Sequence, residues 1–156
     1  MNHQRRTLLK STVATGTIAI AIGAGLLTPQ AVLAAWPKAA FSAKSIDDVL
    51  TTLLGGKQPA SSSDIQVEAP DIAENGAVVS VTVKTSIPNA EQISILVKEN
   101  NMPLAASYVL SPDTDGFITG RIKMAKTSDV IAVVKAGNKL HMAKKSVKVT
   151  LGGCGG

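Results

Sequence analysis

The most distinctive chemical group in the sequence is the thiol of Cys154, the only cysteine among 156 residues. Glycine has no Cβ and leaves the backbone unusually free. An extended residue spans at most about 3.3–3.6 Å, so Cys154 can reach roughly 10 Å beyond Leu151. We therefore predict that residues 151–156 form a flexible arm that carries the thiol outside any core. Its glycines are Gly152, Gly153, Gly155 and Gly156.

Nothing in the sequence activates this thiol. An unperturbed cysteine has a pKa near about 8.5 and is mostly protonated at neutral pH, and a catalytic nucleophile needs a positioned base. His141, on a predicted strand, is interpreted as a surface residue rather than a base or a metal ligand. We predict no catalytic residue in the chain, and we interpret Cys154 as the attachment point of a group that other proteins transform.

A single cysteine also limits the metal and disulfide chemistry. It excludes an internal disulfide and an all-cysteine metal site, and no C-x-x-C-H haem-attachment sequence is present. We expect neither a metal nor a bound cofactor. The thiol can instead form an intermolecular disulfide, so a homodimer linked through Cys154 stays open as a side product or as a tether.

Residues 1–34 have the pattern of an export signal. Arg5-Arg6 precede an apolar run over residues 13–27, and small residues follow up to Ala34. The run is shorter than the roughly 20 residues of a membrane span, and this order is typical of secretory signal peptides. The paired arginines resemble a twin-arginine signal, although Gln4 stands where Ser or Thr is usual and leaves a Sec signal open. We expect cleavage after Ala34, export to the periplasm and no membrane attachment afterwards.

Removal of this segment changes the charge balance. The whole chain has 16 basic and 11 acidic residues. Without Arg5, Arg6 and Lys10 the basic count falls to 13 and the net charge to +2. A chain this close to neutral has no basic footprint for nucleic acid, so we expect no nucleic-acid partner.

Residues 45–56 carry the signals of a short helix. Ser45 can cap its start, and Gly55-Gly56 can end it. Its apolar residues fall on one face at helical spacing, and they are Ile46, Val49, Leu50, Leu53 and Leu54. We expect an amphipathic helix that closes one end of a β core, preceded by an irregular surface segment over residues 35–45.

From residue 65 onward, apolar and polar residues alternate with a period of two, which favours half-buried β-strands. Residues with turn chemistry, such as Asn75-Gly76 and Gly137-Asn138, separate the segments. We predict an all-β fold over residues 35–150, an immunoglobulin-like antiparallel β-sandwich with a short N-terminal helix. Its seven or so strands are expected at residues 65–68, 77–84, 93–98, 104–110, 118–124, 129–136 and 140–151.

One of these strands is apolar on both faces. Val130-Ile131-Ala132-Val133-Val134 buries one set of side chains in the sandwich, and the face with Ile131 and Val133 also needs cover. Either the helix or a loop of the same chain covers it, or this face is an interface with a partner subunit. Val78 and Leu96 are candidates for the same patch.

Three lysines precede the arm. Lys144, Lys145 and Lys148 could supply a positive field for an anionic group on Cys154, or they could form an ordinary solvated strand face. The sequence leaves both readings open.

Three stretches resemble the SoxY family, the sulfur carriers of the periplasmic thiosulfate-oxidising system. The first is the ending Val-Lys-Val-Thr-Leu-Gly-Gly-Cys-Gly-Gly at residues 147–156. The others are Arg-Ile-Lys-Met-Ala-Lys-Thr-Ser-Asp-Val-Ile-Ala-Val-Val at residues 121–134 and Pro-Leu-Ala-Ala-Ser at residues 103–107. The resemblance extends over the whole chain, and its terminal motif is much rarer than a lone cysteine.

The resemblance implies a non-catalytic carrier. It implies a SoxZ partner, with the face at Ile131 and Val133 as a plausible contact, and covalent sulfur adducts on Cys154. SoxAX, a haem enzyme, would couple thiosulfate to the thiol as an S-thiosulfonate, SoxB would release sulfate and leave a persulfide, and SoxCD, where present, would oxidise that sulfur. The alternative is an exported immunoglobulin-like binding or structural module that a disulfide at Cys154 tethers.

Overall fold

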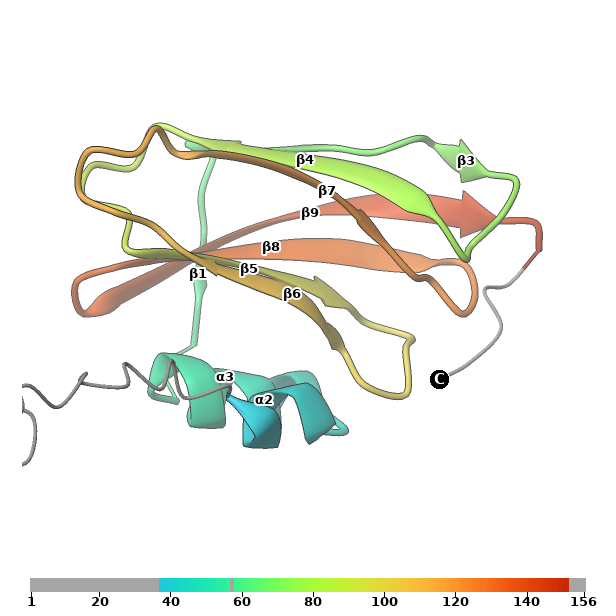
Figure 1. Ribbon diagram of the computed structural model, residues 1–156, viewed down its shortest axis with the longest axis horizontal. Helices are drawn as coiled ribbons and strands as arrows, with labels where there is room; N and C mark the ends of the chain where they lie inside the picture. The colour runs from blue at the N-terminus through green and yellow to red at the C-terminus, as the bar shows by residue number, and fades with distance from the viewer. Residues whose placement is uncertain (1–36, 57, 152–156) are drawn as a thin grey trace, which may run out of the picture. The chain divides into compact units, whose positions relative to one another are not determined.

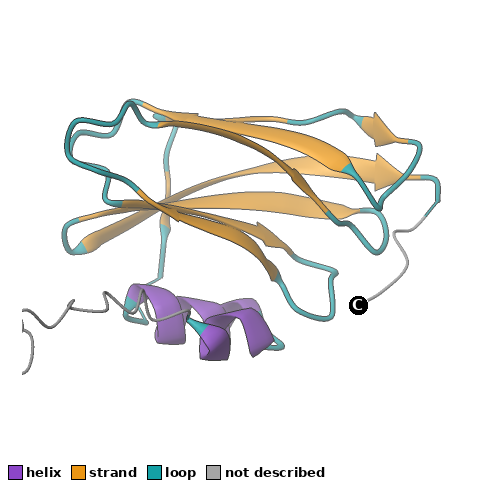
Figure 2. Ribbon diagram, viewed as in Figure 1, coloured by secondary structure: helices purple, strands orange, loops and turns teal. Residues whose placement is uncertain are grey.

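The computed structural model describes residues 37–56 and 58–151, and in them two helices precede nine strands (Figure 1, Figure 2). The helices are α2 (Lys38–Ser42) and α3 (Ile46–Leu54). The strands are β1 (Ala60–Ser61), β2 (Ile65–Glu68), β3 (Ile72–Ala73), β4 (Val79–Thr85), β5 (Gln92–Val97), β6 (Leu104–Val109), β7 (Phe117–Ile122), β8 (Ser128–Ala136) and β9 (Lys139–Val149). The predicted all-β class with a short N-terminal helix is confirmed.

The strands of this part of the chain form two sheets that face each other, as in an immunoglobulin-like sandwich (Figure 1). The larger sheet has the order β1-β9-β8-β5-β6, and the smaller has the order β2-β4-β7. These neighbours are antiparallel except for β1, which runs parallel to β9, as does the additional short strand β3.

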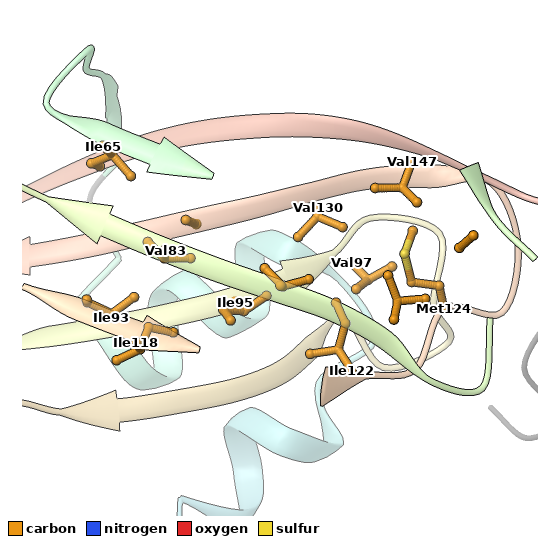
Figure 3. Close-up of a cluster of buried hydrophobic side chains, with 14 of the residues drawn as sticks. Ile65, Val83, Ile93, Ile95, Val97, Ile118, Ile122, Met124, Val130 and Val147 are labelled. Carbon is orange, nitrogen blue, oxygen red and sulfur yellow. The ribbon is translucent and has the colours of Figure 1, made fainter. Parts of the chain in front are cut away.

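The core between the sheets is built from alternate residues of the strands, as the period of two predicts. Val79, Val81 and Val83 of β4 are buried against the side chains that β5, β7 and β8 turn inward. Figure 3 shows this cluster, with Ile93, Ile95, Val97, Ile118, Ile122, Met124, Val130 and Val147 in it. Each fully buried side chain of this size contributes about 1.5–3 kcal/mol to the hydrophobic stabilisation of the fold.

Local signals placed helix α3 correctly. The Ser45 hydroxyl accepts a hydrogen bond from the Asp48 N–H at 3.1 Å and caps the first turn. Gly55 ends the helix in the left-handed conformation, with φ of +85°, which a residue with a Cβ rarely adopts. The irregular segment expected over residues 35–45 contains the short helix α2, whose Ala40 is buried.

The two helices cover a face of the larger sheet, so the prediction that the helix closes one end of the core is wrong (Figure 2). Val49, Leu50 and Leu54 of α3 pack there in a second apolar cluster. The sheet and α2 complete this cluster with Leu96, Leu104, Val133, Leu140 and Ala40. The apolar side of this amphipathic helix is the side that packs on the sheet.

The same packing corrects the proposed partner contact at Ile131 and Val133. Val133 is 1% exposed, and Ile131 is half-buried against the helix-covered cluster. The chain therefore covers this face of β8 itself, which is the first of the two alternatives. Leu96 belongs to the covered patch as expected, whereas Val78 does not belong to it and is 56% exposed.

The predicted export signal, residues 1–34, lies outside the described residues. None of the helices in the described ranges is long and apolar enough to cross a membrane.

Candidate functional site

Cys154 and its flanking residues Gly152, Gly153, Gly155 and Gly156 lie outside the described part of the chain. The structure does describe the segment that leads to them, as far as Leu151. The described part of the candidate site consists of the residues that hold the end of β9.

Strand β9 is held along both of its edges. On one edge it pairs with β8 from Lys139 opposite Ala136 to Val147 opposite Ser128. On the other edge β1 pairs near its beginning and β3 near its end. Both edges of β9 are paired near its beginning, and β3 pairs with Lys148 and Val149 beyond the last pair with β8 at Val147, so pairing extends to the end of the strand that leads toward the cysteine.

The segment over residues 71–76 holds the end of β9 (Figure 1). The Lys148 N–H donates to the Asp71 carbonyl at 2.9 Å, and the Thr150 N–H donates to the Ala73 carbonyl at 3.1 Å. These bonds continue the sheet to one residue before Leu151.

The same segment also binds the last described residues. The Thr150 hydroxyl donates to the Glu74 carbonyl at 3.0 Å. The Gly76 N–H donates to the Leu151 carbonyl at 2.7 Å, and the Gly76 carbonyl accepts from the Met124 N–H at 2.7 Å. The backbone is thus hydrogen-bonded as far as Leu151, three residues before Cys154.

Thr127 closes the opposite side of this support from the loop between β7 and β8. Its hydroxyl accepts from the Val149 N–H at 2.9 Å and lies 3.4 Å from the Val149 carbonyl, to which it can donate. Sequence reasoning missed Thr127 and the 71–76 segment, because a single hydroxyl and a two-residue strand leave no periodic signal.

Two of the three lysines before the arm are paired. Lys145 Nζ lies 2.7 Å from Asp71 Oδ1, and Lys144 Nζ lies 3.5 Å from Asp129 Oδ2. The hydrogen bond from Lys145, and then its charge, lower the pKa of the Asp71 carboxyl. Lys148 is exposed and makes no ion pair with the described residues. Of the three lysines, Lys148 is therefore the candidate source of a positive field at the arm, and this field stays a prediction.

His141 is half-buried on β9, where it pairs with Val134 of β8 and Ala60 of β1. Within residues 37–56 and 58–151, no three His, Cys, Asp or Glu side chains gather into a group that could hold a metal ion. What the geometry provides is a fixed support for a thiol-bearing segment.

These features define a class of protein, a β-sandwich whose last strand leads into a glycine-flanked cysteine. A family model described as "Sulfur oxidation protein SoxY" matches residues 50–154 and so includes Cys154. The chain belongs to the SoxY family of sulfur oxidation proteins.

A solved structure supports the same assignment. The chain is 44% identical to the sulfur carrier protein SoxY from Chlorobium limicola f thiosulfatophilum, with a TM-score of 0.63, over 74% of this chain and 100% of that chain. A lytic polysaccharide monooxygenase from Jonesia denitrificans matches at 15% identity over 52% of this chain and 58% of its own. Its TM-score of 0.39 is too low to carry any argument. None of the curated proteins matches the chain.

Proposed function

We propose that this chain carries sulfur covalently on Cys154 and presents thiosulfate-derived groups to partner enzymes. The main observation behind this proposal is a set of hydrogen bonds from residues 71–76 and Thr127. These bonds hold the backbone of the end of β9 as far as Leu151. Cys154 follows three residues later and lies within the part of the chain that matches the SoxY family. A hydrogen-bonded strand end followed by glycines suits a thiol that enters the active sites of other proteins.

The first step of this function is an oxidative coupling. The Cys154 thiol loses a proton and forms an S–S bond with the outer sulfur of thiosulfate, which gives an S-thiosulfonate. Two electrons leave in this step, and the haem enzyme SoxAX would accept them. Nucleophilic catalysis needs a positioned base, and none is predicted beside Cys154. The chain would therefore contribute only the thiol, and the partner enzyme would contribute the catalytic groups.

The next steps release sulfate. SoxB would add water to the terminal sulfone group, so that sulfate and two protons leave and a persulfide stays on Cys154. Where SoxCD is present, it would remove six electrons from the outer sulfur of the persulfide while three waters supply oxygen. A second hydrolysis would then release sulfate and restore the thiol. The carrier persists through the cycle and is not an enzyme.

The remaining parts of the proposal follow from family membership. Residues 1–34 would export the protein, which would act in the periplasm with a SoxZ partner. Because Val133 lies in the core of this chain, the SoxZ contact is not placed on that face.

Intact mass of the native protein tests the proposal. The protein is purified without reductant from cells grown on thiosulfate, and Cys154→Ser protein from the same growth serves as the control. We expect a population that is heavier by sulfur-containing groups, with the added mass in the C-terminal peptide of the wild type only. A wild-type sample that contains only unmodified monomer and disulfide-linked dimer would favour the tethered-module alternative and contradict the carrier.

A further inference from the structure

Three exposed apolar side chains lie where the described chain leads toward Cys154. Leu151 is 71% exposed, Ile72 is 58% exposed and Val78 is 56% exposed. Six large hydrophobic side chains are exposed among the described residues, and these three are half of them, the others being Met102, Val109 and Phe117. Such a concentration calls for an explanation, because exposed apolar groups that gather in one place mark interaction sites.

Backbone hydrogen bonds tie these three residues to one region, which we call the arm-base patch. Ile72 stands opposite Lys148 in the β3–β9 ladder. Leu151 accepts from Gly76 at 2.7 Å, and Val78 follows Gly76 by two residues. The patch is thus built from the 71–76 segment, the beginning of β4 and the end of β9.

Chain length then limits where a partner can bind. Cys154 is three residues beyond Leu151, so its Cα lies at most about 10 Å away. An enzyme that acts on a sulfur held at Cys154 must bring its reacting groups within that reach. If its active site lies even one layer of side chains below its surface, that surface meets the residues around Leu151.

We infer that the arm-base patch is the docking surface for the rim of a partner enzyme's active-site channel, and that this rim is apolar. The inference rests on the proposed function and adds the surface and the chemistry of the contact. The Lys145–Asp71 pair and the exposed Lys148 lie beside the patch. An apolar centre with a polar rim is the usual composition of an interface between proteins.

The opposite end of the sandwich provides a matched control. Val109 is 84% exposed on β6 and pairs with Gln92 of β5. Gln92 pairs in turn with Lys135 of β8, which stands opposite Leu140 at the beginning of β9. At roughly 3.4 Å per residue, the length of β9 separates this end from Leu151 by about 35 Å. A partner that reaches Cys154 by the shortest route does not touch Val109.

The test measures how the partner hydrolase of the proposed function processes the loaded full-length carrier. For the double variant Ile72→Ser and Val78→Ser, we expect kcat/KM to fall about tenfold, with kcat at saturating carrier unchanged, because only binding is lost. Val109→Ser should stay within twofold of wild type. A loaded synthetic peptide of residues 147–156, which contains Cys154 but neither Ile72 nor Val78, should show a loss at least as large.

The outcomes separate the inference from the function beneath it. If the double variant keeps kcat/KM within twofold of wild type while its unfolding midpoint is unchanged, the arm-base patch is not the docking surface. A loss of equal size in Val109→Ser would also overturn the inference. No turnover of the loaded wild-type carrier would contradict the proposed function itself and remove the inference with it.

Discussion

Single side chains hold the backbone at the end of β9, shortly before the cysteine motif. The Thr127 hydroxyl is bonded to Val149 of β9, although the two residues are 22 positions apart in the sequence. A short polar side chain thus does at this site what a further strand would do elsewhere, because it satisfies the exposed backbone groups of Val149. The thiol itself lies five residues after Val149, so the precision of its starting point depends on such contacts.

Replacement of Thr127 by Val tests this role. Thr127→Val keeps the shape of the side chain but removes the bond to the Val149 N–H, so we expect a loss of about 0.5–1.5 kcal/mol in local stability. Hydrogen exchange at the Val149 amide should become faster by a corresponding factor. Thr119→Val is the control, since its hydroxyl bonds Thr82 on the smaller sheet at 2.9 Å. Equal exchange at Val149 in wild type and Thr127→Val would show that the hydroxyl does not hold β9.

Elements behave differently from single residues, because their positions depend on contacts between distant parts of the chain. Helix α3 could be predicted, since Ser45 and Gly55 mark its ends locally. Its place on the face of the larger sheet could not be predicted from these signals, because the partners Leu96, Leu104 and Leu140 come from three separate strands. Apolar side chains on both faces of β8 showed that cover was needed but not which element supplied it.

The burial of Val133 beneath the helices leads to a prediction on stability. Val133→Thr is nearly isosteric but buries a hydroxyl, which costs about 1–3 kcal/mol where no partner is available. Val78→Thr is the control at an exposed valine and should change the free energy of unfolding by less than about 0.5 kcal/mol. Urea unfolding of both variants measures the difference. Equal free energies of unfolding for the two variants would contradict the burial of Val133 beneath the helices.

Strand β3 is held to β9 partly by an ion pair that depends on pH. Lys145 lowers the pKa of Asp71 below its usual value of 3.8, so the pair stabilises the folded state above that pH. This contribution is lost as the pH falls through the folded-state pKa of Asp71. The effect is small, because Asp71 is exposed.

We therefore expect Asp71→Asn to remove part of the acid dependence of stability. Urea unfolding of wild type and variant should differ at neutral pH and converge once the pH is below the folded-state pKa of Asp71. Asp113→Asn, at an exposed carboxylate in the loop before β7, is the control and should follow wild type throughout. A constant difference between Asp71→Asn and wild type at all pH values would assign the change to another cause.

At the scale of the whole molecule, the sandwich that the sequence predicted is confirmed, whereas the role of Cys154 stays a prediction. Alternation along β4 and β5 is a local consequence of the pleat, so the burial of Val81 and Ile95 followed from it. The cysteine motif is also local, since five adjacent residues carry it. The support for that motif is not local, because Ile72 pairs with Lys148 far along the chain through a strand of only two residues. Sequence patterns therefore predicted thiol chemistry at Cys154 and missed the β3–β9 pairing that holds the chain before it.

The most direct test of the carrier function follows two differently labelled sulfur atoms of thiosulfate. Samples labelled at either the outer or the sulfone sulfur are coupled to the full-length protein by the haem enzyme and then treated with the hydrolase. We predict that both labels first map to the peptide with Cys154, that hydrolysis releases the sulfone label as sulfate, and that the outer label stays. Cys154→Ser should take up neither label and should keep the wild-type unfolding midpoint. Equal labelling of Cys154→Ser, or the absence of both labels from the C-terminal peptide of wild type, would contradict covalent sulfur transport on Cys154.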